Sequence, residues 1–298
     1  MRAGLLQSGA ASSDGHVVCK HCLSGNVVRN GRKGQVQYYL CRSCRRAFAD
    51  TDAPPGMRYA AHPIGAALAM FYDGLSIDAI RKQLAALDGI HPSDSTVHGW
   101  IMHFTENAIG GIEASSVEVS DVWMAVETVM DREEDERVWD IVDSTTRFLL
   151  ACRVSRGRTR LDVQALLMEA FLVADRLPRV IVAEGLGPYL DPDELDVRDA
   201  CGHTGAGGWS IQADTNLTVR LRDVLQARVR LVGRMKNADT TRLVRDGWRA
   251  HYNFFRAQAE LGGKTPGQAA RTTVSYGSWE DVVRGEGVVG LPLNGTPG

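Results

Sequence analysis

The sequence lacks any apolar stretch long enough to cross a bilayer, which requires about 20 consecutive apolar residues. Its opening segment, MRAGLLQSGAASSDGH, also lacks the basic start and apolar core of a secretory signal. We therefore expect a cytoplasmic protein without a membrane partner. Apolar residues make up 44% of the 298 residues and charged residues 23%, which argues against a chain that is disordered throughout.

Cysteine is scarce, and four of the six cysteines form two Cys-x-x-Cys pairs separated by eighteen residues. Two thiolates with this spacing can point at one tetrahedral zinc ion, and a cytosolic setting favours a metal over a disulfide. Between the pairs, NVVRNG and QVQYYLC predict a short hairpin that brings the second pair to the first. We predict a zinc ribbon at residues 15–50 that binds structural Zn²⁺ through Cys19, Cys22, Cys41 and Cys44.

Charge is distributed unevenly, although the net formal charge of the chain is only −2. Residues 1–60 contain nine basic and three acidic residues, a net charge of +6, whereas residues 131–136 read DREEDE. A basic N-terminal part suits contact with phosphates, and a solvated surface explains the same charges equally well. If this part binds DNA, its candidate contact residues are Arg42, Arg45 and Arg46.

Residues 57–110 follow a Pro/Gly linker and predict three helices. The second helix begins after Ser76 and carries its apolar face as far as Leu87, and the third begins after Ser93 or Asp94. Two short helices joined by a turn, the second polar at its front, form the helix-turn-helix pattern of DNA readers. A three-helix packing unit with no DNA role is the alternative. The candidate DNA-contacting residues are Ser95, Thr96 and His98.

Residues 118–275 alternate strands and helices. DVWMAVETVM, RVWDIVD and RFLLACRVS predict three consecutive strands, followed by a helix at about 159–175 and the buried strand RVIVAEG. Long helices are predicted at about 216–231 and 238–256. Three antiparallel strands followed by alternating helix and strand describe the ribonuclease-H-like, integrase-type mixed sheet, so the predicted fold class is α/β. The Gly-rich residues 276–298 predict a flexible tail.

Several segments resemble bacterial and archaeal insertion-sequence transposases of the DDE class, close to the insertion-sequence-six type. The resemblance runs from Cys19 to about Ala270. Besides the cysteine pairs, the matching segments are GLSIDAIRKQL, STVHGW, VWMAVET, DSTTRFLLACRVSRGRT, VIVAEGLGPY and GWRAHYNFFRAQAELGGKTPGQAA. In such enzymes three carboxylates hold two divalent metal ions that drive attack on a phosphodiester. The resemblance implies double-stranded DNA as a partner, association with the nucleoid, and a homodimer.

The resemblance places the three catalytic positions at Val126, Glu184 and Val219, where the family pattern has Asp, Asp and Glu. This chain reads VET in place of DET and AEG in place of TDG, and the separations of 58 and 35 residues support the register. Valine has no lone pair to offer a metal, and the extra methylene of Glu184 displaces its oxygens from a site that needs accurate placement. The resemblance therefore implies a catalytic centre that has lost most of its metal ligands.

Neighbouring acidic residues offer an alternative. Glu127 is adjacent to Val126, but successive strand residues point to opposite faces. Asp223 lies one helical turn after Val219, and Asp140 lies on the neighbouring strand. Either acid is a possible substitute in a relocated site that would require Mg²⁺ or Mn²⁺, and either could equally be a solvated surface group.

Three hypotheses about function follow. The first is a transposase-family DNA-binding protein that recognises transposon-end-like DNA and is catalytically inactive. The second is an active DDE-type transposase with a relocated two-metal site. The third is a protein-interaction module that uses the old cleft, made more apolar by Val126 and Val219.

Overall fold

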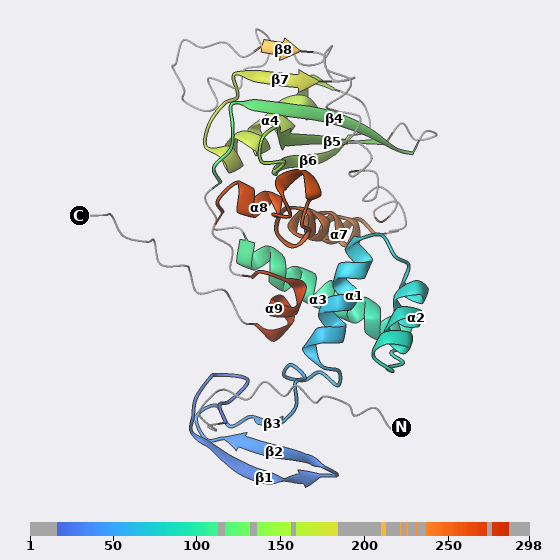
Figure 1. Cartoon of the computed structure of the whole chain (residues 1–298), viewed down its shortest axis with the longest axis vertical. Helices are drawn as coiled ribbons and strands as arrows, with labels where there is room; N and C mark the ends of the chain where they lie inside the picture. The colour runs from blue at the N-terminus through green and yellow to red at the C-terminus, as the bar shows by residue number, and fades with distance from the viewer. Residues whose placement is uncertain are drawn as a thin grey trace, which may run out of the picture.

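The molecule has three parts along its long axis: a small sheet, a group of helices, and a larger sheet (Figure 1). In the described residues, no helix is both long and apolar enough to cross a membrane. The computed structural model describes residues 17–112, 117–131, 136–155, 159–183, 210–212, 221, 225, 231, 237–272 and 276–285.

The small sheet confirms the predicted hairpin. Strands β1 (Val27–Lys33), β2 (Val36–Cys41) and β3 (Ala47–Ala49) pair antiparallel in the order β1-β2-β3. Its apolar cluster is small, with Phe48 buried and stacked on Tyr39 at a ring-centroid distance of 5.8 Å. So little buried apolar surface is a weak source of stability, and a bound metal is the usual remedy in domains of this size.

Three helices follow the small sheet: α1 (Ala61–Tyr72), α2 (Ile77–Leu87) and α3 (Asp94–Ile112). Side chains cap α2 and α3 where the sequence predicts. Ser76 Oγ accepts a hydrogen bond from the Ala79 backbone N–H at 3.2 Å. Ser93 Oγ likewise accepts from the Thr96 N–H at 3.2 Å.

The predicted apolar face of α2 is correct in its middle and wrong at its end. Ile80 and Leu84 are buried against α1 and α3, but Leu87 is 76% exposed. Leu87 is the last residue of the helix, past the turns that pack on the neighbouring helices.

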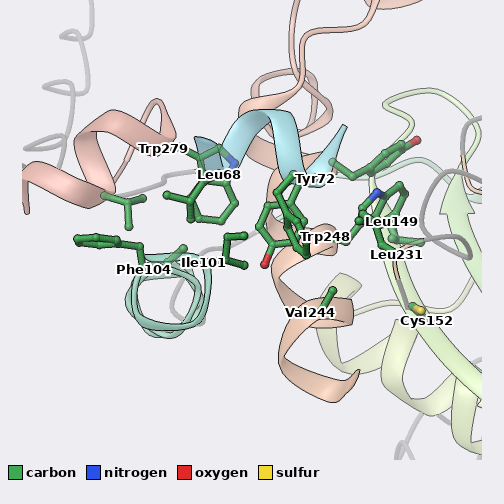
Figure 2. Packing of buried hydrophobic residues seen from close by; sticks show 14 of the residues in the cluster. Leu68, Tyr72, Ile101, Phe104, Leu149, Cys152, Leu231, Val244, Trp248 and Trp279 are labelled. Atoms are coloured by element: carbon green, nitrogen blue, oxygen red, sulfur yellow. The ribbon is translucent and has the colours of Figure 1, made fainter. Parts of the chain in front are cut away.

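Helices α7 (Ala238–Ala250) and α9 (Trp279–Arg284) pack onto α1 and α3 from the far end of the chain. The approach of α7 depends on Gly247, where a Cβ would lie 2.2 Å from Tyr72 Oη and 2.5 Å from Thr105 Cγ2. Figure 2 shows how the buried side chains of this cluster meet, among them Leu68, Tyr72, Ile101, Phe104, Val244, Trp248 and Trp279.

The larger sheet consists of β4 (Val122–Asp131), β5 (Glu136–Asp143), β6 (Leu149–Ser155), β7 (Val180–Ala183) and β8 (Ser210–Gln212). The strand order is β6-β5-β4-β7-β8. Strands β4, β5 and β6 pair antiparallel, as the sequence predicts for three consecutive strands. Strand β7, the predicted buried strand, runs parallel to β4, and β8 runs parallel to β7. Helix α4 (Arg160–Ala174) connects β6 to β7 and begins with a capping box between Thr159 and Asp162.

The two faces of this sheet are buried in different apolar clusters. One face carries Trp139 and Ile141 and packs against Val163 and Leu166 of α4. The opposite face carries Met124, Val126 and Val142 and belongs to the same cluster as the helices of the middle part. A sheet buried on both sides leaves its central strands enclosed.

The segment between α7 and α9 forms a π-helical turn, η2 (His251–Phe255), a 3₁₀ turn, η3 (Ala259–Leu261), and a short helix, α8 (Pro266–Ala269). The Asn253 side chain continues the edge of the sheet. Its Oδ1 accepts from the Leu149 backbone N–H at 2.9 Å, and its Nδ2 donates to the Leu149 carbonyl at 3.1 Å.

The prediction of a flexible tail from residue 276 is wrong for α9. Trp279 is 2% exposed and donates its Nε1–H to His251 Nδ1 at 3.0 Å. Arg284 pairs with Asp52, in the linker before α1, at 2.5 Å. The sequence does not predict this helix because the region is rich in glycine. The residues that stabilise it, His251 and Asp52, also lie far away in the chain.

Candidate functional site

The four predicted zinc ligands converge on one point. The Cys19 and Cys44 sulfurs are 3.6 Å apart, as are those of Cys22 and Cys41, and all four lie within 4.8 Å of one another. Thiolates bound to one tetrahedral zinc ion at about 2.3 Å stand roughly 3.8 Å apart. All four cysteines are free thiols, and their positions suit a single zinc ion.

The two cysteine pairs share one backbone geometry. Cys19 N–H and Cys41 N–H each donate to the carbonyl five residues later, both at 2.9 Å. The residue after each pair has a left-handed backbone conformation, with φ 59° at Leu23 and φ 58° at Arg45. This turn folds the chain back around the sulfurs, so each pair can present two thiolates to the same metal.

Backbone amides prepare one of these sulfurs for metal binding. The Cys44 backbone N–H lowers the pKa of Cys41 below its ordinary value despite burial, which opposes the change, and the Cys22 thiol and Ser43 N–H lower this pKa further. The pKa of Cys22 rises in turn: the Ser24 backbone N–H lowers it, but burial and the other three thiols raise it by more. The thiolate is the form that binds zinc. A zinc ion held by these residues would crosslink the small sheet and supply no catalytic chemistry.

The predicted DNA-contacting residues lie on the surface of two separate elements. Arg42, Arg45 and Arg46 are all exposed around the second cysteine pair. At the start of α3, Ser95 and His98 are exposed and Thr96 is half-buried. Arg81 fixes the preceding turn, because its Nε donates to the Pro92 carbonyl at 2.8 Å and its Nη1 contacts Asp94 Oδ1 at 2.6 Å.

The first predicted catalytic position lies at the centre of the larger sheet. Val126 is in the middle of β4, is fully buried, and pairs directly with Asp140 of β5. The two side chains therefore share one face of the sheet. Val126 belongs to the same apolar cluster as Met124, Val142 and Leu225. A buried apolar side chain thus occupies the position where a metal ligand is expected, with the Asp140 carboxylate as its cross-strand neighbour.

Asp140 is the described candidate for a substitute ligand, and it is fully buried. Ala183, the last residue of β7, pairs in parallel with Ala125, next to Val126. Leu221 and Leu225 are helical and buried in the cluster that contains Val126. The other predicted positions lie outside the described residues: Glu184, Val219 and Asp223.

Glu127 points away from Val126, as predicted. Its Oε1 accepts a hydrogen bond from Trp139 Nε1 at 3.1 Å and lies 3.5 Å from Arg137 Nε. Trp139 belongs to the cluster beneath α4, on the opposite face of the sheet from Val126. Glu127 therefore cannot replace a carboxylate at Val126.

Comparisons with solved structures give distant similarities, two of which are described here. The chain is similar to the catalytic core domain of BIV integrase, with a TM-score of 0.36 and 14% identity, over 51% of this chain and 94% of that chain. It is also similar to a chain of the simian T-cell lymphotropic virus intasome solved with PP2A regulatory subunit B56 gamma. There the TM-score is 0.41 and the identity 14%, over 68% of this chain and 71% of that chain.

No protein-family model matches the chain, and no curated protein matches it. At TM-scores below 0.5, neither structural similarity carries an argument about this chain.

A cavity of about 220 Å³ beside the β5–β6 turn has no counterpart in the sequence predictions. Arg147 and Arg256 both line it, although they lie 109 residues apart in the chain. No local motif could reveal the cavity, because the fold alone brings its two sides together.

Proposed function

We propose that this chain is a double-stranded-DNA-binding protein of DDE-transposase ancestry that no longer cleaves or joins DNA. The observation that carries the proposal is Val126, fully buried at the centre of β4 among apolar side chains. Because valine supplies no ligand atom, a two-metal centre of the ancestral kind would lack its first carboxylate.

The loss of a metal ligand has a large expected effect. Divalent metals stabilise the charge that develops on the attacked phosphate and activate the attacking oxygen, and each role contributes several kcal/mol in enzymes that use it. Burial adds a second obstacle, since a metal ion at Val126 would have to enter an apolar cluster in which Asp140 is the one described carboxylate paired with Val126.

DNA binding is supported by the N-terminal half of the chain. Four cysteines suited to one zinc ion hold a small sheet whose second cysteine pair exposes Arg42, Arg45 and Arg46. Exposed guanidinium groups bind backbone phosphates. On a separate element, the start of α3 exposes Ser95 and His98, which supports a helix-turn-helix role for α2 and α3.

Salt dependence of DNA binding tests this proposal. Each phosphate contact contributes about 0.9 to the slope of log affinity against log salt concentration. A triple variant, Arg42→Gln, Arg45→Gln and Arg46→Gln, should lower that slope by up to about 3 relative to the unaltered chain. Arg242→Gln on α7, whose side chain is 79% exposed, is the matched control and should leave the slope unchanged. Equal slopes for the triple variant and the unaltered chain would contradict the proposed DNA-binding surface.

A second candidate function, an active transposase with a relocated metal site, is favoured by one observation: Asp140 pairs directly with Val126. This candidate predicts Mn²⁺ binding that Asp140→Asn weakens and that Asp175→Asn does not. Asp175 is an exposed residue with φ 51° at the end of α4, and asparagine tolerates that conformation well. No Mn²⁺ binding to the zinc-loaded chain would exclude this candidate.

A further inference from the structure

The 220 Å³ cavity lies between the turn that joins β5 to β6 and the segment that follows η2. Its volume far exceeds the about 10–15 Å³ that a single water needs, so it has room for a small ligand group. In the described part of the chain its polar lining consists of Arg147, Tyr252, Arg256, Gln258 and Glu260.

Arg147 is held in place by a buried turn. Asp143 is fully buried, and its Oδ2 accepts from both the backbone N–H and the Oγ1 of Thr146 at 2.7 Å. Asp143 Oδ1 accepts from the Ser120 N–H at 2.9 Å, and the Arg147 N–H donates to the Asp143 carbonyl at 3.0 Å. Arg147 itself has φ 59°, a conformation that non-glycine residues rarely adopt. The buried turn therefore holds Arg147 in an uncommon backbone conformation at the wall of the cavity.

Hydrogen-bond donors exceed acceptors in the cavity lining. The Arg147 side chain is 19% exposed, and its Nη2 lies 3.5 Å from Glu260 Oε2, whose side chain is 54% exposed. Arg256 forms no ion pair with a described residue. Gln258 Nε2 is buried and makes no hydrogen bond within 3.5 Å to a described residue, although the Gln258 side chain lies close enough to the Tyr252 hydroxyl to lower its pKa. Two guanidinium groups and the Gln258 amide therefore share the lining with one solvent-facing carboxylate, and the Asp73 carboxylate, which is not in the described lining, interacts electrostatically with Arg256.

The tyrosine in the lining stays neutral. Burial raises the pKa of Tyr252 to about 12, although Gln258 and Arg147 oppose the increase, and the nearby Asp140 carboxylate adds to it. Its hydroxyl donates to the Arg147 carbonyl at 3.0 Å. Asp140 is not among the described residues that line the cavity.

We propose that this cavity binds a phosphoryl group through Arg147, Arg256 and Gln258. Guanidinium groups present paired N–H donors that match the oxygens of a phosphate, and the Gln258 amide adds a further donor. The same tetrahedral oxyanion chemistry is offered by a DNA backbone phosphate and by free inorganic phosphate. If the bound group is a DNA phosphate, this inference rests on the proposed function; if it is free inorganic phosphate, the inference stands without it.

The cavity lies on the face of the sheet that carries Val126. Arg147 Nη1 contacts Met124 Sδ at 3.5 Å. Met124 and Val126 are two residues apart in β4, so their side chains lie on the same face of the sheet. Leu221, which also lines the cavity, belongs to the same apolar cluster as Val126. A DNA phosphate held in the cavity would therefore lie near Val126, and the guanidinium groups of Arg147 and Arg256 would bind it in place of metal ions.

Thermal unfolding of the zinc-loaded full chain tests for the phosphoryl group itself. Inorganic phosphate, compared with chloride at equal ionic strength, should raise the unfolding temperature of the unaltered chain and of the control Arg242→Gln. Arg256→Gln should abolish that rise, and Arg256→Lys, which keeps the charge without the paired donors, should restore part of it. Circular dichroism before heating establishes that each variant is folded. A phosphate-dependent rise of equal size in Arg256→Gln would overturn the assignment.

Salt-dependent DNA binding then identifies the source of the phosphoryl group. If it belongs to DNA, Arg256→Gln should reduce the slope of log affinity against log salt by about 0.9, the contribution of one phosphate contact. An unchanged slope together with stabilisation by inorganic phosphate would support free phosphate as the ligand. Stabilisation by phosphate in a chain that binds no DNA would refute the proposed function and support the cavity assignment. No stabilisation and no change in slope would overturn the inference.

Discussion

Replacing Gly247 by alanine should destabilise the junction between the helices and the C-terminal segment by about 3 kcal/mol. The new Cβ would lie 2.2 Å from Tyr72 Oη and 2.5 Å from Thr105 Cγ2, so side chains or α7 must move. Overpacking of this kind costs about 1–3 kcal/mol. Moving Tyr72 also breaks its 2.6 Å hydrogen bond to Thr105 Oγ1 inside the core, and a buried unsatisfied hydroxyl costs a further 1–3 kcal/mol, roughly.

Helix propensity opposes this loss, because alanine in a helix interior is favoured over glycine by about 1 kcal/mol. The assay is chemical denaturation of the zinc-loaded chain, with the midpoint and slope measured for each variant. Gly99→Ala on α3 is the matched control: no atom lies within 4 Å of the position that its methyl group would take, so it should gain about 0.5–1 kcal/mol. Tyr72→Phe removes the nearest clashing atom, so Gly247→Ala should cost less in that background. A Gly247→Ala variant as stable as the unaltered chain would refute this packing argument.

Three further predictions concern the metal, the sheet edge and acid stability. A chelator should remove one zinc ion per chain and unfold the small sheet while the larger sheet persists, as followed by metal analysis and proteolysis; retention of the sheet without zinc would count against the metal site. Asn253→Ala should lower the free energy of unfolding by about 2–4 kcal/mol, because it leaves both the N–H and the carbonyl of Leu149 without their partner, and denaturation would measure this loss. The His251 hydrogen bond lowers the pKa of Asp73 below 3.8, so its stabilisation is present above that pH and is lost as pH falls through the folded-state pKa. In His251→Gln the Asp73 pKa should return toward 3.8 in an NMR titration of its carboxyl carbon, and an unchanged pKa would refute the coupling.

Features with a local cause could be predicted from the sequence. The two cysteine pairs, the hairpin between them and the serine caps of α2 and α3 depend on residues close together in the chain, and the structure confirms each of them. The placement of Asp140 on the strand next to Val126 also follows from strand order, because consecutive antiparallel strands are neighbours, whereas the direct pairing of the two residues is seen only in the structure.

Features with a long-range cause could not be predicted. Helix α9 is a short segment in a Gly-rich region, and His251 and Asp52 hold it from distant parts of the chain. The cavity depends in the same way on Arg147 and Arg256, which only the folded chain brings together. Exposure at a helix end, as at Leu87, likewise depends on where the neighbouring helices stop.

The most direct test of the central claim is a combined binding and cleavage assay on the zinc-loaded chain. It uses labelled duplexes from the DNA that flanks its own gene, first in Mg²⁺ and then in Mn²⁺, with a gel-shift measurement on the same duplexes. The account predicts DNA binding without nicking or strand transfer in either metal, because Val126 leaves the first ligand position without an oxygen. Metal-dependent cleavage that is lost in Glu184→Ala or Asp140→Asn would contradict it and show that other carboxylates hold the metals.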